Sequence, residues 1–446
     1  MGPCRAAART GEQACLTVAG SFTAYLAPHL IIARPNGTQF GHLGLELLMA
    51  FAEARRARAR LVLVEPPDLV NRALFHLRPE GVRVFRWPRW TSAVVLPRLW
   101  MSGWRSHARV ALRQASDAVR DEAAETLRWH LGRTPMPQAL QRRLRQAKSA
   151  LGRRSAPPRG YVRVRETYYR RQLIRTPISV ALPAGWHDMA TALAQRVGIP
   201  KDRPIVTIHT RESGFKSGGR EVHEKHDRER VLGVRDDSLR NSSIEDYRPA
   251  VALLRDRGFC VVRLGDSTMA PLDWPGVVDL TTLTGSDAVL QVYCLMRSRF
   301  LIAGESGPTG VSMLTNTPVL TVNATDPIGS YPIRRASLVL LKRIIDRATR
   351  QTLSPFDLLT DEYYTHLRDP VRFEYTDNTP DELVRAVTGI VERLDGCADT
   401  VGQERFREAA THAAESLRDR FAYVRKWGTD DEFLGDGGIA AFSVSA

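Results

Sequence analysis

Between residues 186 and 325 short apolar runs alternate with longer segments of helical spacing, and this alternation limits the possible folds more than any other feature. Buried strands are predicted at 205–208, 260–264, 300–303 and 319–322, and helices at 188–197, 243–257, 288–298 and after residue 306. Helices that join successive strands in this way produce a parallel sheet. We therefore predict an α/β fold that closes with helices over 380–394 and 402–426 and a loose tail from residue 435.

The first part of the chain carries a second, less regular α/β pattern. A strand is predicted at 29–33, a helix at 43–58 and strands at 61–64, 82–85 and 92–96, with long helices over 106–150. The length of 446 residues suits two domains of roughly 150–200 residues each. The predicted domains are 1–185 with a helical insertion at about 105–155, 186–400, and a C-terminal helix and tail at 401–446.

The positive charge of the chain is local. Residues 104–175 contain 18 Lys and Arg against 5 Asp and Glu, which accounts for most of the net charge of +15. Aromatic residues are few there and no nucleic-acid module fits, so nucleic acid is not an expected partner. The segment 128–175 is interpreted either as a contact with an anionic membrane surface or as a solvated helical face.

Cysteine usage indicates the compartment. The five cysteines show no paired spacing, so neither a zinc site nor a disulfide framework is predicted, and a cytoplasmic setting fits best. The uncharged stretch 14–33 superficially suggests a signal peptide, but it contains Gly20, Pro28 and His29 and lacks a clear cleavage site. Its end is therefore interpreted as a first core strand.

Four polar or glycine-rich loops follow predicted strands, at 36–44, 209–214, 264–266 and 304–310. Ligands of open parallel sheets bind beyond the carboxyl ends of the strands, which makes these loops the candidate site. In the last loop, "GESGPTG", three glycines allow close backbone approach, and Ser306 and Thr309 suit the start of a helix. Such a helix start suits phosphate, although an ordinary capped turn would look similar.

Two charged or titratable side chains in these loops are candidates for chemistry. Arg211 can form bidentate hydrogen bonds with phosphate, or it can be a surface arginine paired with Glu212. His42, at the start of the first predicted helix, is either a general base or a cap, and Glu46 one turn later can orient it or replace it.

The acidic and histidine-bearing loop 214–239 also invites a metal interpretation. His223 and His226 lie in it among many Lys and Arg residues, without an apolar frame that would preorganise metal ligands. We interpret this loop as a charged flap and predict no metal.

Three segments resemble a family of bacterial glycosyltransferases: "VTIHTRESGF", "RNSSIEDYRPAVALLRDRGFCVVRLGD" and "FLIAGESGPTGVSMLTNTPVLTVNATDP". The resemblance covers residues 200–395, and the first half mainly through "FGHLGLELL". The Ser-Gly-Pro loop is similar to that of heptosyltransferases, and the His-x-Arg element resembles the donor-binding arginine motif of fucosyltransferases.

The resemblance implies the GT-B architecture, in which two Rossmann-like domains with parallel sheets face each other across a cleft and no metal cofactor is needed. It places the donor in the second domain and the acceptor mainly in the first, with the C-terminal helix bracing the first domain. The implied donor diphosphate ligands are Arg211, Arg240, Asn241, Ser306, Gly307 and Thr309. The implied nucleoside and sugar contacts are Gly265, Asp266, Glu305 and Asn323, and the candidate bases are His42, Glu46 and Glu212.

The expected activity is transfer of a sugar from a nucleotide diphosphate sugar to a hydroxyl on a glycan, a lipid-linked carrier or a natural product, with inversion. One alternative is a nucleotide-sugar epimerase, for which Glu212 and Glu305 would supply paired carboxylates. The other is a non-catalytic module that binds nucleotide or anionic lipid. The expected location is the cytoplasm, with peripheral contact at the inner membrane face.

Overall fold

The computed structural model describes residues 22–27, 29–66, 69–88, 175, 177–212, 237–283, 285–418, 421 and 435–444. The predicted strand at 92–96, the helices over 106–150, nearly all of the basic segment and residues 213–236 of the charged loop lie outside these ranges. His223 and His226 therefore also lie outside the described residues.

The first half forms a small sheet in the order β1-β2-β3-β5. Strand β1 (Phe22–Ala27) is antiparallel to β2 (Leu30–Arg34), so the end of the uncharged stretch forms a hairpin in place of the single strand predicted. Strands β3 (Arg60–Val64) and β5 (Val84–Trp87) continue the sheet in parallel. Helix α2 (Phe40–Arg56) and the short α3 (Arg72–His76) pack with it, and β4 (Arg78–Pro79) pairs with β6 (Val180–Ala181).

The second half contains a sheet of seven strands in the order β9-β8-β7-β10-β11-β12-β15, and all its pairings are parallel. The strands are β7 (Ile205–His209), β8 (Cys260–Arg263), β9 (Val277–Asp279), β10 (Ser298–Ala303), β11 (Val319–Ala324), β12 (Leu338–Leu341) and β15 (Gly438–Ile439). In chain order the first six of these strands follow the Rossmann arrangement 3-2-1-4-5-6. The predicted α/β class, with two sheets of mainly parallel strands, is confirmed.

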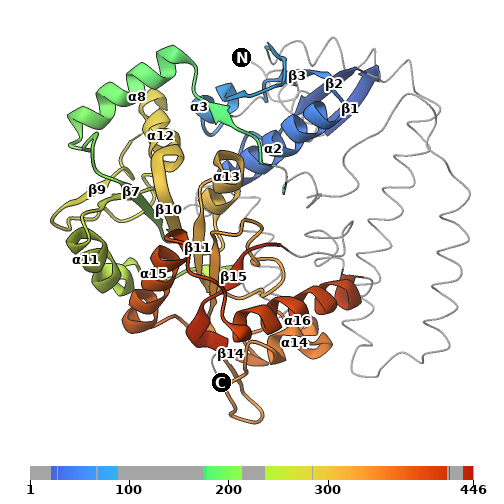
Figure 1. The fold of residues 1–446 in the computed structure, drawn as a ribbon, viewed down its shortest axis with the longest axis vertical. Helices are drawn as coiled ribbons and strands as arrows, with labels where there is room; N and C mark the ends of the chain where they lie inside the picture. Colours follow the sequence, from blue (N-terminus) through green and yellow to red (C-terminus); the bar gives the residue numbers. More distant parts are fainter. Residues whose placement is uncertain are drawn as a thin grey trace, which may run out of the picture.

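Helices cover both faces of this sheet (Figure 1). One face packs against α8 (Ala184–Arg196), α12 (Val289–Arg297) and α13 (Gly307–Thr315), and the other against α11 (Arg248–Asp256) and α15 (Pro380–Leu394). Helix α15 begins at the residue predicted, because Thr379 and Glu382 form a capping box around Pro380 at its first position.

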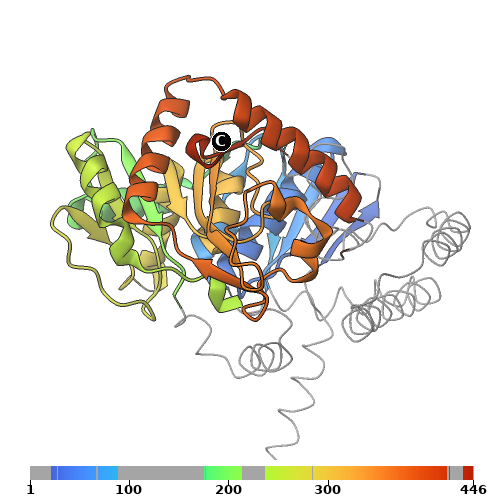
Figure 2. The ribbon, with the colours of Figure 1, turned by 90° about the horizontal axis from the view of Figure 1, so that it is seen from below.

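Several elements of the second half were not predicted. They are strands β9 and β12, the hairpin of β13 (Arg343–Asp346) and β14 (Phe373–Thr376), helix α14 (Asp361–Thr365), and the 3-10 helices η1 (Asp237–Arg240), η3 (Gly285–Ala288), η4 (Asp357–Leu359) and η5 (Ala441–Val444). The 3-10 helix η2 (Ile244–Tyr247) forms the start of the helix predicted over 243–257. Helix α16 (Val401–Arg418) packs against β15, η4 and η5, and Figure 2 shows it with α15 along one side of the molecule. The predicted bracing of the first domain by this helix stays a prediction.

The loose tail predicted from residue 435 is wrong for the residues that the structure describes. Strand β15 adds the seventh strand to the sheet beside β12, and Ile439 and Ala440 are buried. The two glycines at 435 and 437 bring the chain into contact with Pro332, where a Cβ atom would not fit. The apolar residues that follow the glycines therefore reach the core. The glycine-rich composition of the segment as a whole had indicated a loose tail instead.

The two halves meet through α2 and α13, and Figure 1 shows α2 between the small sheet and α13. A Cβ atom at Gly41 would lie 2.8 Å from Cα of Gly307, and one at Gly310 would lie 2.7 Å from the carbonyl oxygen of Gly41. Buried residues of both halves form one continuous core around this contact. Along α2 and α13 the two halves are therefore packed directly against each other.

None of the described helices is both long and apolar enough to cross a membrane.

Candidate functional site

The candidate site lies where the order of the large sheet reverses, between β7 and β10. The strands that follow β7 in the chain, β8 and β9, lie on one side of it, and β10, β11 and β12 lie on the other side. The connections that leave β7 and β10 therefore run in opposite directions across the sheet, although the ends of these two strands are adjacent. His209 at the end of β7 pairs in register with Ala303 at the end of β10. The predicted loops 209–214 and 304–310 are therefore neighbours at the position where doubly wound folds bind ligands.

The loop after β10 starts helix α13 with an uncapped turn. Ser306 is the N-cap residue, but its hydroxyl makes no capping bond, and its buried Oγ has no hydrogen-bond partner in the protein. Thr309 uses its hydroxyl to donate to the carbonyl oxygen of Gly304 at 3.0 Å. The amide groups of the first turn of α13 are therefore not covered by Ser306, as a helix start that binds an anion requires.

Two further polar atoms at the end of β7 are buried without a hydrogen-bond partner, Nδ1 of His209 and Oγ1 of Thr210. Burial lowers the pKa of His209 to about 4, against the opposing influence of Asp266, so the imidazole is neutral at pH 7. Buried polar atoms are rarely left unsatisfied in proteins. These atoms lie at the strand end next to the loop after β10, which contains Ser306. The carboxyl end of the sheet is therefore polar at this point and suited to a ligand.

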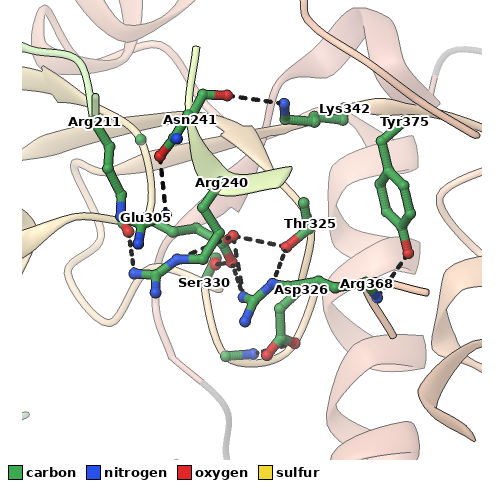
Figure 3. A network of polar contacts seen from close by, with 12 residues as sticks. Arg211, Arg240, Asn241, Glu305, Thr325, Asp326, Ser330, Lys342, Arg368 and Tyr375 are labelled. Atoms are coloured by element: carbon green, nitrogen blue, oxygen red, sulfur yellow. Dashed lines mark hydrogen bonds and ion pairs between the residues drawn. The ribbon is translucent and has the colours of Figure 1, made fainter. Parts of the chain in front are cut away.

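Arg211 contacts Asn241 and Ser242, which directly follow Arg240 in the chain. Its guanidinium donates to Oδ1 of Asn241 at 3.0 Å, and its carbonyl oxygen accepts from the amide of Ser242 at 3.3 Å. Lys342, directly after β12, donates to the carbonyl oxygen of Asn241 at 3.2 Å (Figure 3). The structure therefore brings Arg211, Arg240 and Asn241 together beside the loop after β10.

Glu305 is the centre of a buried ionic network. Its carboxylate accepts from Oγ1 of Thr325 at 2.7 Å, from Oγ of Ser330 at 2.5 Å, and from the guanidinium of Arg368 at 3.2 Å at both oxygens. Arg240 donates to the carbonyl oxygen of Glu305, and its Nε lies 3.9 Å from Oε2. Burial alone would raise the pKa of Glu305, but Arg368, Arg240 and the two hydroxyl groups together lower it, so the carboxylate is ionised.

Sequence reasoning missed Lys342 and Arg368. Lys342 follows a buried strand, so the strand-end rule would have found it if the apolar run Leu338–Leu341 had been recognised as a strand. Arg368 follows α14 with a positive φ of 61° and is buried. No periodicity or motif in the sequence points to it.

Glu212 pairs with Arg263 and not with Arg211 as the surface interpretation would have it. Its Oε1 accepts from the guanidinium of Arg263 at 2.8 Å, and Asp279 lies 3.3 Å from the same guanidinium. The side chain of Arg263 is fully buried, so Glu212 and Asp279 compensate a charge that has no access to water. Proton abstraction by Glu212 would remove part of that compensation.

Gly265 and Asp266 lie at the end of β8, one strand away from β7. Gln291 bonds both backbone groups of Gly265, with its amide nitrogen 2.8 Å from the carbonyl oxygen. Asp266 accepts from the amide and the hydroxyl of Thr268 and so closes a turn. A Cβ atom at Gly265 would lie 2.2 Å from the sulfur of Met269 and 2.8 Å from the methyl carbon of Thr281, so any larger residue there would force these side chains to shift.

Asn323, at the end of β11, is fully buried and adopts a positive φ of 53°. Its side-chain oxygen accepts from the amide of Asn378 at 2.6 Å, and the side-chain oxygen of Asn378 accepts from the amide of Asn323 at 2.7 Å. The nitrogen of its side chain donates to the hydroxyl of Tyr247 at 3.4 Å. This side chain is thus engaged in joining three loops of the protein.

The first turn of α2 carries the candidate bases of the first half. The contact of Gly41 with Gly307 places this turn against the first turn of α13, so the amino ends of both helices converge next to the candidate site. His42 is partly exposed there. Glu46 accepts from the amide of Asn36 at 2.7 Å and so fixes the loop before the helix.

Among the residues described, no group of three or more His, Cys, Asp and Glu side chains is placed to hold a metal ion.

No protein-family model and no curated protein matches the sequence. Solved structures similar to this chain include a glycosyl transferase family 9 protein from Veillonella parvula, with 12% identity, a TM-score of 0.31, and coverage of 63% of this chain and 77% of that one. E. coli ADP-heptose LPS heptosyltransferase II has 13% identity, a TM-score of 0.40, and coverage of 82% and 100%. The glycotransferase of kitacinnamycin has 12% identity, a TM-score of 0.25, and coverage of 90% and 98%. At TM-scores below 0.5 these likenesses carry no argument about activity.

Proposed function

We propose that this chain is a glycosyltransferase that moves a sugar from a nucleotide diphosphate sugar to a hydroxyl acceptor, without a metal cofactor and with inversion. The observation that carries the proposal is the meeting of Arg211, Arg240 and the uncapped start of α13 at the point where the Rossmann sheet reverses. Two guanidinium groups and a helix amino end match the charge and geometry of a diphosphate.

In the proposed reaction the acceptor oxygen forms a bond with the anomeric carbon, and the bond from that carbon to the diphosphate oxygen breaks. The diphosphate leaves with the bonding electrons, and Arg211, Arg240 and the amides at Ser306 and Gly307 stabilise its charge, with Asn241 and Thr309 supporting them. This electrostatic role is the one that a metal ion fulfils in other transferases.

The proton of the acceptor hydroxyl goes to a base in the same proposal. His42 is the preferred candidate, because the contact between α2 and α13 brings its turn to the phosphate loop. Glu46 and Glu212 are weaker candidates, since the first holds Asn36 and the second compensates Arg263. Gly265 and Asp266 are assigned to the nucleoside side of the donor because they end the neighbouring strand.

The epimerase alternative needs two free carboxylates near the sugar. Glu305 is enclosed by Arg368, Thr325 and Ser330, and Glu212 is paired with Arg263, so neither is available without breaking a buried ion pair. The arrangement therefore favours transfer over epimerisation. A binding module remains the second candidate, and it predicts nucleotide binding without turnover.

The proposal also includes contact of the segment 128–175 with an anionic membrane surface and a cytoplasmic location.

The test is a thermal-shift and calorimetric screen of UDP, GDP, ADP and CMP against the wild-type chain, Arg211→Ala and Arg203→Ala. Arg203 is a matched control, because it precedes the same strand at the opposite edge of the sheet and bonds the carbonyl oxygens of Gly258 and Phe259. Loss of the Arg211 contact should weaken diphosphate binding by about 10- to 100-fold, as expected for a charge-assisted hydrogen bond.

Arg203→Ala should bind like the wild type. If no nucleotide stabilises the wild-type chain, the transferase proposal is refuted. Release of free sugar from one sugar nucleotide in the absence of acceptor would favour transfer, and binding without any turnover would favour the non-catalytic module.

A further inference from the structure

Glu305 lies in the predicted phosphate loop, yet its carboxylate is buried and bound inside the protein. Figure 3 shows Arg240 and Arg368 reaching Glu305 from two sides, with Thr325 and Ser330 completing the ring around the carboxylate. A sugar hydroxyl would have to displace one of these groups. A role as a sugar ligand, which the sequence suggested, is therefore less consistent with the geometry than a role within the protein.

Arg368 is the fixed end of this network. Its side chain is 5% exposed, its Nε donates to Oγ1 of Thr325 at 2.8 Å, and its backbone amide donates to the hydroxyl of Tyr375 at 2.8 Å. Its side chain therefore has less rotational freedom than a surface arginine or an arginine that binds and releases a ligand. Arg368 consequently holds the Glu305 carboxylate in one orientation.

Arg240 is the other end, and it faces the candidate site. Its side chain is 25% exposed, and it contacts Glu305 twice, through the backbone carbonyl oxygen and through the carboxylate. The next residue, Asn241, binds Arg211. The chain of contacts therefore runs from Arg368 through Glu305 to Arg240, and it ends beside Arg211.

We propose that Glu305 and Arg368 are positioning residues for the diphosphate: Arg368 fixes Glu305, and Glu305 fixes both the guanidinium of Arg240 and the turn that starts α13. The inference rests on the proposed function, because it assumes a diphosphate ligand at this edge of the sheet. Its physical basis is preorganisation, since an arginine that is already ordered loses less entropy when it binds a phosphate.

The rival explanation is that the pair merely stabilises the fold, and a double variant separates the two. Glu305→Gln alone would remove the carboxylate that faces both Arg240 and the buried Arg368, whereas Glu305→Gln combined with Arg368→Gln removes one charge of each sign. The measurement is calorimetric binding of UDP and UMP, GDP and GMP, and ADP and AMP to the folded double variant.

We expect the double variant to bind its diphosphate about 3- to 10-fold more weakly than the wild type, with unchanged affinity for the monophosphate. Adding Arg240→Gln to the double variant should weaken binding less than Arg240→Gln does in the wild type, because the two changes remove one shared contact. Arg393→Gln with Asp399→Asn is the matched control. That largely buried pair lies near the end of α15, where Leu394 and Asp395 contact Arg299 at the opposite edge of the sheet.

Wild-type diphosphate affinity in the double variant would overturn the inference while leaving the proposed function intact, and so would an equal loss for diphosphate and monophosphate. If the wild-type chain itself binds no diphosphate, both proposals fall together.

If the double variant does not fold, Arg240→Lys provides the test, since it leaves Glu305 and Arg368 unchanged and keeps the positive charge. A single ammonium group does not reproduce the planar fork of the guanidinium. We expect the same selective loss of diphosphate affinity, and wild-type affinity in Arg240→Lys would overturn the inference.

Discussion

Replacement of Gly310 by alanine tests whether α2 and α13 touch as closely as the structure shows. The new Cβ would lie 2.7 Å from the carbonyl oxygen of Gly41, whereas ordinary contacts begin near 3.4 Å, and all three nearest atoms belong to the backbone of Gly41. The helices would have to separate by about 0.7 Å, and overpacking of this kind costs about 1–3 kcal/mol. Alanine regains about 1 kcal/mol through its helix propensity, so we expect net destabilisation of up to about 2 kcal/mol.

Gly389 in α15 is the matched control, because it also lies within a helix and a Cβ there would meet a single atom, 3.9 Å away on Leu338. Gly389→Ala should stabilise the chain by about 0.5–1 kcal/mol. The assay is urea unfolding followed by tryptophan fluorescence, with the midpoints of the two variants compared. Equal stabilisation by both alanines would refute the close contact of the two helices.

Two further predictions concern single side chains. The pKa of His209 falls from 6.5 to about 4 on folding, so the unfolded chain binds the extra proton between these values. The stability that a neutral His209 contributes is present above about pH 6.5 and is lost towards pH 4 at up to about 1.4 kcal/mol per pH unit. His209→Gln should remove this part of the slope in urea unfolding, and an unchanged slope would contradict the assignment. Ile439→Ala should destabilise the chain by about 2–5 kcal/mol, because Ile439 is fully buried in β15. The exposed Val401→Ala is its control, and equal unfolding midpoints would contradict the docking of β15.

Four strands of the large sheet, β7, β8, β10 and β11, and the helices that cover the sheet could be predicted because each of them carries a strong local signal. The run Ile205–Ile208 is apolar throughout, and α15 begins at a residue flanked by a capping threonine and a proline. Strand β12 was missed although Leu338–Leu341 is entirely apolar, because it is short and no helix pattern separates it from β11. The small strand β9 gave even less periodicity to detect.

The glycines of the candidate site were identified from the sequence, but only part of the reason for glycine at these positions was predicted. Sequence reasoning assigned Gly307 and Gly310 to the approach of a ligand, whereas the structure shows that both also admit the backbone of α2. A glycine in a sequence indicates that another group approaches the backbone closely, but it does not indicate whether that group is a ligand or another part of the protein. The partner of α13 lies more than 260 residues earlier in the chain, at Gly41, and no local pattern connects the two.

Charged side chains were the least predictable part of the site. Arg211 and Arg240 were found because they follow strand ends or a motif, but their partners were not. The partner of Glu212 is Arg263, in the middle of an apolar run, and the partner of Glu305 is Arg368, in an irregular loop. Ion pairs of this kind depend on the tertiary fold, so sequence spacing contains little information about them.

The pairing of β12 with β15 has a consequence for how the chain is made. Leu338 pairs with Gly438, so the outer edge of β12 receives its neighbour from a segment about a hundred residues later. At synthesis rates of about 5–20 residues per second, that edge stays open for about 5–20 seconds after β12 has left the ribosome. An open apolar edge is a template for pairing with other chains, and expression conditions that slow translation should therefore increase aggregation of this protein.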